Sequence, residues 1–160
     1  MKNYAIILNE EIVYKYQSEE QQVFGGKWGS KEAIQKVIPS TVQFDYAEYK
    51  SGKIVNATGT LTAIKEKKKA ESISNYKAVA SAKYDAIDQA VMQSQFSRLV
   101  DKKLNGDTLT TAETAKYTEI QTKQSQIESL FNQAETHSTA IDKLTSISSA
   151  SSYDTTISDV

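Results

Sequence analysis

The sequence predicts an α+β chain, in which a small N-terminal antiparallel β domain with one short helix precedes a long antiparallel helical hairpin or coiled coil. Eight of the fourteen aromatic residues lie in the first fifty positions, which favours a small aromatic core there. After Gly59 the chain contains a single further glycine, Gly106, and no proline, as expected of long helices. The predicted parts are a β-rich docking domain at 1–58, a helical pair at 59–147 with its turn at 105–107, and a Ser/Thr-rich tail at 148–160.

Alternation and turn residues predict the first two strands. The runs Asn3–Leu8 and Glu11–Gln17 are rich in β-branched and aromatic side chains. Between them, Asn9 and Glu10 fit a two-residue hairpin loop, because Asn tolerates positive φ. We therefore expect a β-hairpin at the start of the chain.

The rest of the β domain is predicted to hold one short helix and two more strands. Ser30 is a suitable N-cap for a helix that ends before Pro39. Residues 42–46 alternate apolar and polar side chains, and Ile54–Ala57 follows a Ser-Gly turn. Together these runs predict a four-stranded antiparallel sheet with one short helix.

Two long helices are predicted after residue 59. Residues 61–104 contain no helix breaker, so we expect one rod about 65 Å long at 1.5 Å per residue. Its apolar series follows helical spacing and comprises Ile73, Tyr76, Ala80, Tyr84, Ile87, Val91, Phe96 and Leu99. Gly106 suits the left-handed position that ends a helix, and the next helix should begin at Thr110 or Thr111 with Glu113 in its first turn.

The second helix carries a heptad pattern. Ile120, Ile127, Ala134 and Ile141 recur every seven residues, and Leu130, His137 and Leu144 follow the last three of them by three positions. The pattern fits a coiled-coil stripe, and equally an ordinary amphipathic helix packed on its neighbour. We assign as candidate partner-binding residues Ile120, Ile127, Leu130, Ile141 and Leu144. The stripe serves either a hairpin within one chain or a homodimer or homotrimer.

Charge is distributed unevenly along a chain whose net charge is −1. Residues 1–58 are neutral, residues 59–104 carry nine basic and five acidic side chains, and residues 105–160 carry three basic and eight acidic ones. The opposite signs of the two helices favour their mutual approach, although apolar packing must supply most of the stability. Overall neutrality predicts no binding to nucleic acid and none to a membrane.

The residue inventory excludes several kinds of chemistry. The chain has no cysteine and a single histidine, which rules out a disulfide framework, a thiol nucleophile and a multi-histidine metal site. His137 lies on the heptad stripe, so a structural role is favoured over that of a general base. We predict no catalytic, cofactor-binding or metal-binding residue, and no enzymatic activity.

Two further features bear on partners. Trp28 stands in a glycine-rich stretch and is the candidate contact anchor of the first domain, with burial in the core as the alternative. The Ser/Thr-rich tail from residue 148 onward is expected to be flexible.

Two stretches carry a family resemblance. Residues 4–13, Tyr-Ala-Ile-Ile-Leu-Asn-Glu-Glu-Ile-Val, resemble the start of many small tailed-phage proteins, and residues 99–113, from Leu99 to Glu113, are similar to the ending of the tail-fibre assembly (chaperone) family. Of that family's aromatic-basic cluster the chain keeps Tyr117 without its arginine. The resemblance implies a non-enzymatic bacteriophage tail component that binds tail-fibre or baseplate proteins. It also implies a location in the virion tail, and in the host cytoplasm during assembly.

An alternative interpretation has the same helices and a different partner. The chain would then be a coiled-coil adaptor or scaffold protein unrelated to tail fibres. Presence in purified virions and binding to co-expressed fibre distinguish the two.

Overall fold

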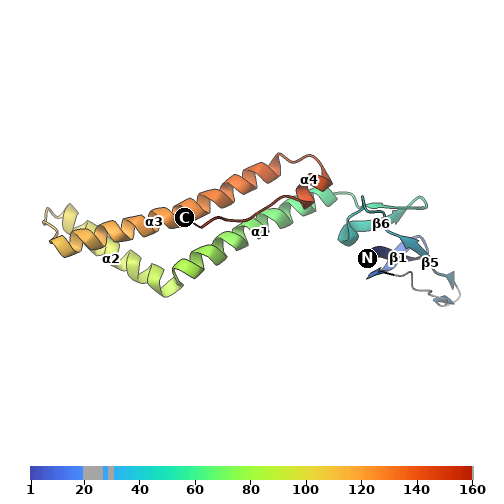
Figure 1. The fold of residues 1–160 in the computed structure, drawn as a ribbon, viewed down its shortest axis with the longest axis horizontal. Helices are drawn as coiled ribbons and strands as arrows, with labels where there is room; N and C mark the ends of the chain where they lie inside the picture. The colour runs from blue at the N-terminus through green and yellow to red at the C-terminus, as the bar shows by residue number, and fades with distance from the viewer. Residues whose placement is uncertain (20–26, 29–30, 160) are drawn as a thin grey trace. The chain divides into compact units, whose positions relative to one another are not determined.

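The computed structural model describes residues 1–19, 27–28 and 31–159, with the side chains of 27, 28, 31 and 32 left aside. It confirms a mixed α+β chain, with antiparallel strands first and helices after them (Figure 1). The chain divides into two compact units, Met1–Ala63 and Ile64–Val160. We describe each unit by itself.

A three-stranded antiparallel sheet with the order β2-β1-β5 opens the first unit. It is built from β1 (Lys2–Leu8), β2 (Glu11–Ser18) and β5 (Ile34–Val37). Asn9 and Glu10 have φ angles of 53° and 65°, as both central residues of a type I′ hairpin turn require. The predicted hairpin is therefore confirmed.

The helix predicted between Ser30 and Pro39 is wrong, because this stretch contains strands β4 (Lys31–Glu32) and β5. In β5, Ile34 pairs with Ile7 and Val37 pairs with Tyr4 across β1. β-branched residues suit a strand, and pairing with β1 satisfies backbone groups along its second edge. That gain overrides the short apolar periodicity that favoured a helix.

The single four-stranded sheet is also wrong. Two further two-stranded sheets exist, one from β3 (Lys27–Trp28) with β4, and one from β6 (Ala47–Lys50) with β7 (Lys53–Asn56). The strand expected over 42–46 is a loop followed by the 3₁₀ turn η1 (Phe44–Tyr46). The Asn56 side chain holds this loop, since its Oδ1 accepts from the Gln43 amide at 2.8 Å and its Nδ2 donates to the Thr41 carbonyl at 3.2 Å.

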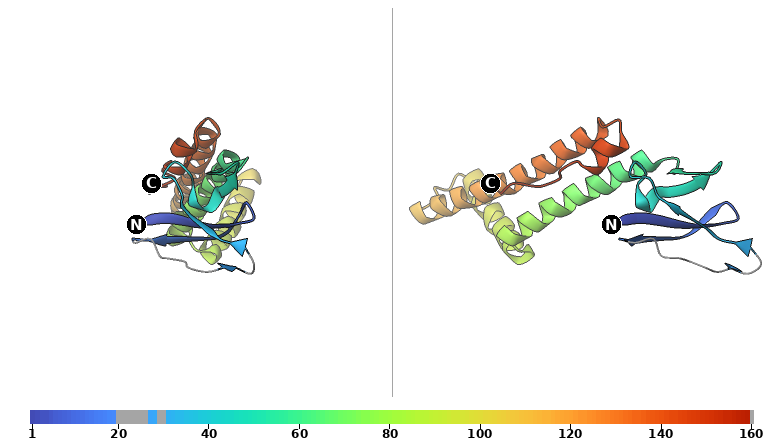
Figure 2. Two further views of the ribbon diagram at one scale, coloured as in Figure 1. Left: turned by 90° about the vertical axis from the view of Figure 1, so that its right-hand side faces the viewer. Right: turned by 45° about the vertical axis from the view of Figure 1, so that its right-hand side comes forward.

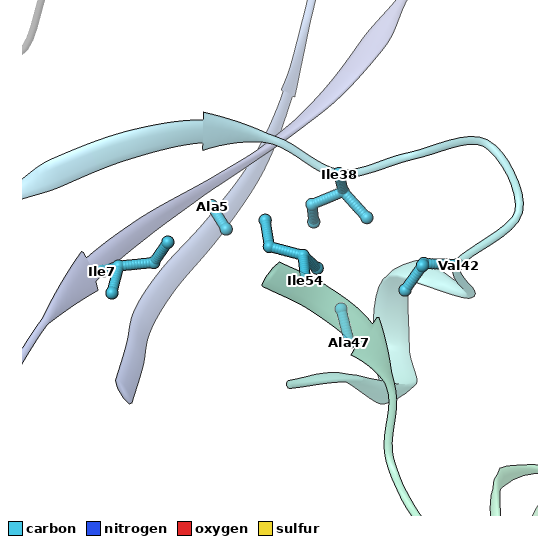
Figure 3. Close-up of a cluster of buried hydrophobic side chains, with 6 residues drawn as sticks. All are labelled: Ala5, Ile7, Ile38, Val42, Ala47 and Ile54. Carbon is cyan, nitrogen blue, oxygen red and sulfur yellow. The ribbon is translucent and has the colours of Figure 1, made fainter. Parts of the chain in front are cut away.

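A small apolar core joins the two larger sheets of this unit (Figure 3). Its buried members are Ala5, Ile7, Ile38, Val42, Ala47 and Ile54. The Lys15 side chain of β2 reaches η1, where it donates to the Phe44 carbonyl at 2.9 Å. The core therefore lies on one face of β1, between β1 and the β6–β7 pair.

The second unit contains α1 (Thr60–Lys83), whose first turn lies in the first unit, α2 (Ala86–Leu104), α3 (Thr111–Asp142) and α4 (Ile147–Ser151). The expected uninterrupted helix over 61–104 is wrong, because it breaks at Tyr84 and Asp85. Asp85 is extended, with φ −69° and ψ 170°, and its carboxylate accepts from the Asp88 amide at 2.8 Å as an N-cap. The Tyr84 hydroxyl donates to Oε1 of Gln126 on α3 at 2.8 Å, which gives the break a tertiary partner.

The start of α3 confirms the predicted cap. The Thr110 hydroxyl accepts from the Glu113 amide, and the Glu113 carboxylate accepts from the Thr110 amide, so both halves of a capping box are present. Gly106 has φ 83°, as expected of the residue that ends the preceding helix.

Helices α2 and α3 pack through one cluster of buried side chains. Met92 and Leu99 of α2 surround Ile120 of α3, and Phe96 stacks on Tyr117 with ring centroids 5.2 Å apart. Lys102 pairs with Glu113 at the end of α2 nearest the turn. In each contact, the α2 residue and the α3 residue lie at similar sequence distances before and after the connection at 105–110.

The segment after α4 departs from the expectation of a flexible tail. Residues 153–159 are extended and run between α1 and α3, as both Figure 1 and the right-hand view of Figure 2 show. Ala150 of α4 is buried, as are Thr155 and Ile157 of the segment. The segment is thus part of the packing of the second unit.

Candidate functional site

The predicted partner-binding residues on α3 lie at different depths. Ile120, Leu130 and Ile141 are fully buried, whereas Ile127 and Leu144 are half-buried. Ile120 packs on α2 and Leu130 packs on α1 and the segment after α4. The buried residues therefore serve the fold of this chain, and their contact with a partner stays a prediction.

Trp28 has a defined backbone and an undescribed side chain. Its backbone pairs with Lys31 where β3 meets β4. The side chain lies outside the described residues, as does most of the glycine-rich stretch before it. Its role as a contact anchor stays a prediction.

Side chains of α1 and α3 recognise the backbone of segment 153–159. Asn75 of α1 donates to the Thr155 carbonyl at 2.9 Å. Gln133 of α3 forms a two-way contact, in which its Nε2 donates to the Ser158 carbonyl at 3.0 Å and its Oε1 accepts from the Ser158 amide at 2.9 Å. This pattern resembles the way in which a neighbouring strand would satisfy an extended chain.

His137 adds a third polar contact. Its Nε2 lies 3.0 Å from the Thr156 carbonyl and its Nδ1 lies 3.1 Å from the Tyr153 hydroxyl. Because a carbonyl only accepts, Nε2 is assigned as the donor, and in the neutral ring Nδ1 then accepts from the hydroxyl. The one histidine of the chain therefore anchors the segment from the heptad stripe of α3.

Two side chains of the segment, those of Thr155 and Ile157, are buried, with one residue between them. Ile157 is 6% exposed and packs with Ala80, Leu130 and Ala134, while Thr155 is 2% exposed. We call the groove formed by Asn75, Ala80, Leu130, Gln133 and His137 the segment groove.

The segment also contacts an acidic side chain of α1. Hydrogen bonds from Lys68, and secondarily from Thr155 of the segment, hold the pKa of the Glu71 carboxyl below its ordinary value.

The segment also carries negative charge toward α1. Lys83 pairs with Asp159 at 2.6 Å. Hydrogen bonds from the Thr156 hydroxyl and amide hold the pKa of Asp154 below its ordinary value. The Asp154 carboxylate therefore remains ionised at neutral pH.

The segment groove was not predicted, because the sequence carries only a weak signal for it. Ile157 is the one apolar side chain among residues 154–158, within a run of Asp, Thr and Ser. Its burial together with that of Thr155, two positions earlier, has the period of an extended chain with one buried face, but a single apolar residue does not establish that period in the sequence. Burial of those two side chains is what turns the tail into part of the structure.

Charge pairs join α1 to the far end of α3. Lys69 lies 2.6 Å from Asp142 and 3.2 Å from Glu66, and the hydrogen bond to Asp142 is the main cause of the raised pKa of Lys69. Lys65 donates to the Asp142 carbonyl at 2.9 Å. Two lysines of the basic run at 65–69 thus contact the acidic helix within the same chain.

Part of the predicted apolar series on α1 and α2 faces solvent. Ile87 is 74% exposed, and Val91, one turn later, is 48% exposed. Ile73 of α1 is exposed to the same degree as Val91, whereas Tyr76 and Ala80 pack near Leu130. The series with helical spacing therefore does not form one continuous buried face, because these three residues are exposed.

Among residues 1–19, 27–28 and 31–159, no three His, Asp or Glu side chains gather in a group that could hold a metal ion. Within that same described part of the chain, no helix combines the length and the apolar character that crossing a bilayer requires.

Surface hollows on α3, such as the one between Asn132 and Lys143, are lined by successive turns of that single helix.

Comparison with protein-family models, with curated proteins and with solved structures finds no match to this chain.

Proposed function

We propose that this chain is a non-enzymatic bacteriophage tail component, which attaches to tail-fibre or baseplate proteins or assists their assembly through protein–protein contacts. The observation that carries the proposal is the exposed apolar pair Ile87 and Val91 on α2. Single exposed apolar residues are ordinary, but two of them one turn apart on a helix match the way an amphipathic helix meets a partner helix.

The pair belongs to a periodic apolar series of which several other members pack inside the chain. Tyr84 and Phe96, on either side of the pair in the sequence, pack in the cluster around Ile120. We infer that α2 has two functions, with one side packed on α3 and the side of Ile87 and Val91 offered to a helix of a fibre or baseplate protein. In this proposal α2 and α3 act as an antiparallel helical hairpin whose heptad stripe is used within the chain.

The tail setting comes from the resemblance carried by residues 4–13 and 99–113. Within the second stretch lie Lys102, Gly106, Thr110 and Glu113, which form the turn and the cap between α2 and α3. The similar residues are therefore those that set the geometry of the pair. This agreement supports a shared helical ending with the tail-fibre assembly family.

The test combines virion composition with direct binding. The chain should be detected by mass spectrometry in purified virions or in assembly intermediates, and it should co-purify with co-expressed fibre protein. The double variant Ile87→Glu, Val91→Glu should lose at least tenfold of that co-purification. Absence from both particles and from fibre complexes would overturn the proposal.

A matched control separates lost binding from lost folding. Gln93→Glu adds a charge at an exposed position of α2 on another side of the helix. This variant should bind fibre as the unmodified chain does, and all variants should have the same helical circular dichroism. Equal loss in the control would show that charge on α2, and not the apolar pair, governs binding.

A further inference from the structure

The helical unit already binds one extended polypeptide, namely its own residues 153–159. The contacts that Asn75, Gln133 and His137 make to this segment reach its backbone from side chains on α1 and α3. Such contacts depend on the segment being extended and not on which molecule supplies it. Any second chain with the same residues therefore presents the same donors and acceptors.

We propose that two copies of this chain associate by exchanging the element 147–159, so that the segment 153–159 of each copy occupies the segment groove of the other and α4 moves with it. Exchange of an identical element is a low-cost route to a dimer, because every contact in the exchanged form already exists in the closed form. The proposal goes beyond the assignment to a phage tail and does not depend on it.

The segment carries its own selectivity for this groove. Ile157 fills the space beside Ala80, Leu130 and Ala134, and Thr155 lies buried two residues earlier. Two buried side chains at alternate positions fix the register, because a shift by one residue would turn both of them to the wrong face. A second copy of this chain carries the same two side chains at the same spacing, so its segment fits the groove in the same register.

Charge also favours the segment of a second copy as the occupant of the segment groove. The segment brings Asp154 and Asp159, and Lys83 of α1 pairs with Asp159 at 2.6 Å. Residues 59–104, which include α1, carry nine basic against five acidic side chains. An acidic extended segment is therefore attracted to the groove.

The connection between α3 and α4 is the place where exchange can occur. It consists of residues 143–146, and Lys143 and Leu144 continue the last turn of α3 through bonds to the carbonyls of Ala140 and Ile141 at 3.2 and 3.1 Å. Straightening four residues spans about 13 Å at ~3.3 Å per residue. Such an extension directs α4 and the segment away from their own groove toward that of a neighbour.

Site-directed cross-linking of the full chain tests the exchange, because the sequence contains no cysteine that could interfere. Gln133→Cys marks the groove and Ser158→Cys marks the segment, at two residues that are in direct contact. The double variant, treated with a short bis-maleimide, should form an internal cross-link. A mixture of the two single variants, one of them with an affinity tag, should form a heterodimer.

The mixture is incubated at a chain concentration of about 0.5 mM, on the order of the effective concentration of a tethered segment. The control pair uses Gln121→Cys, at an exposed position three turns away on α3, together with Ser158→Cys. We expect at least tenfold more heterodimer from the Gln133 pair than from the Gln121 pair.

Adding Ile157→Asp to the Ser158→Cys chain should reduce the heterodimer at least tenfold, because the segment then loses its buried side chain. The exchange proposal is overturned if the double variant closes internally while the mixture yields no more heterodimer than the control pair. It is equally overturned if Ile157→Asp leaves the heterodimer unchanged, since the link would then arise from random collision. No fibre protein is present, so neither result bears on the proposed tail function.

Discussion

At the scale of single residues, Glu113 is an ionisable group whose pKa is strongly lowered. Hydrogen bonds from Lys102 and then from the Thr110 amide lower the pKa of its carboxyl to about 2, from an ordinary value of 4.5. The same carboxylate completes the capping box of α3. One side chain therefore ties the end of α2 to the start of α3.

The lowered pKa predicts a defined pH dependence. Because the folded pKa is lower than the unfolded one, the stabilisation from ionised Glu113 is complete above pH 4.5 and is lost as the pH falls toward 2. Glu113→Gln should lower the urea midpoint at pH 7, and the difference from the unmodified chain should shrink between pH 4.5 and 3. Glu128→Gln, at an exposed position of α3, is the control. A difference that does not vary with pH would contradict the charge pair.

At the scale of elements, the break between α1 and α2 is decided by one cap and one long-range contact. Asp85 caps α2 through the Asp88 amide, and Tyr84 reaches Gln126 on α3. Each residue alone is compatible with a helix interior, and together they favour a bend. The bend lets α1 line the segment groove with Asn75 and Ala80 while α2 packs on α3.

Removing the cap should destabilise the second unit. We expect Asp85→Ala to lower the free energy of unfolding by about 1 kcal/mol, since the first turn of α2 loses its side-chain acceptor. Urea denaturation followed by circular dichroism measures this change, with Gln93→Ala as the control in the middle of the same helix. If the helical signal rises and stability does not fall, α1 and α2 have instead joined into one helix. The Tyr84–Gln126 contact would then not require the bend.

At the scale of the whole molecule, the buried apolar clusters belong to separate units. In the first unit Ile54 is buried around Ala5 and Ile7, and in the second unit Leu130 is buried around Ala80 and Ile157, beside the further cluster around Ile120. No residue belongs to the clusters of both units. The stability of each unit is therefore expected to follow its own core.

Separate cores predict that each of two core truncations destabilises only the unit that contains it. Leu130→Ala and Ile54→Ala should each cost about 3 kcal/mol in the unit that contains them. Hydrogen exchange followed by mass spectrometry should show faster exchange in α3 for the first variant and in β1 for the second, with the other unit unchanged. If either variant speeds exchange in both units together, the chain unfolds as one cooperative body.

Local features of this chain were predictable because they depend on neighbours in the sequence. The Asn9–Glu10 turn, the Gly106 stop and the Thr110–Glu113 cap each involve groups within four positions of one another. Turn and cap preferences are chemical properties of such short stretches. The heptad stripe likewise indicated three residues that are fully buried on α3, Ile120, Leu130 and Ile141.

Only the tertiary structure decided the features that need a distant partner. Residues 34–37 form a strand because β1 offers them an edge, and the helix breaks at Tyr84 where that side chain meets Gln126, 42 residues away. The segment around Ile157 is ordered because Ala80 and Leu130 exclude water from its side chain. The sequence by itself therefore determined the α+β class, the Asn9–Glu10 turn, the Gly106 stop, the Thr110 cap and the buried stripe of α3. Packing decided which strands pair, where the long helix bends and which groove the last segment fills, because burial and backbone pairing outweigh local propensity.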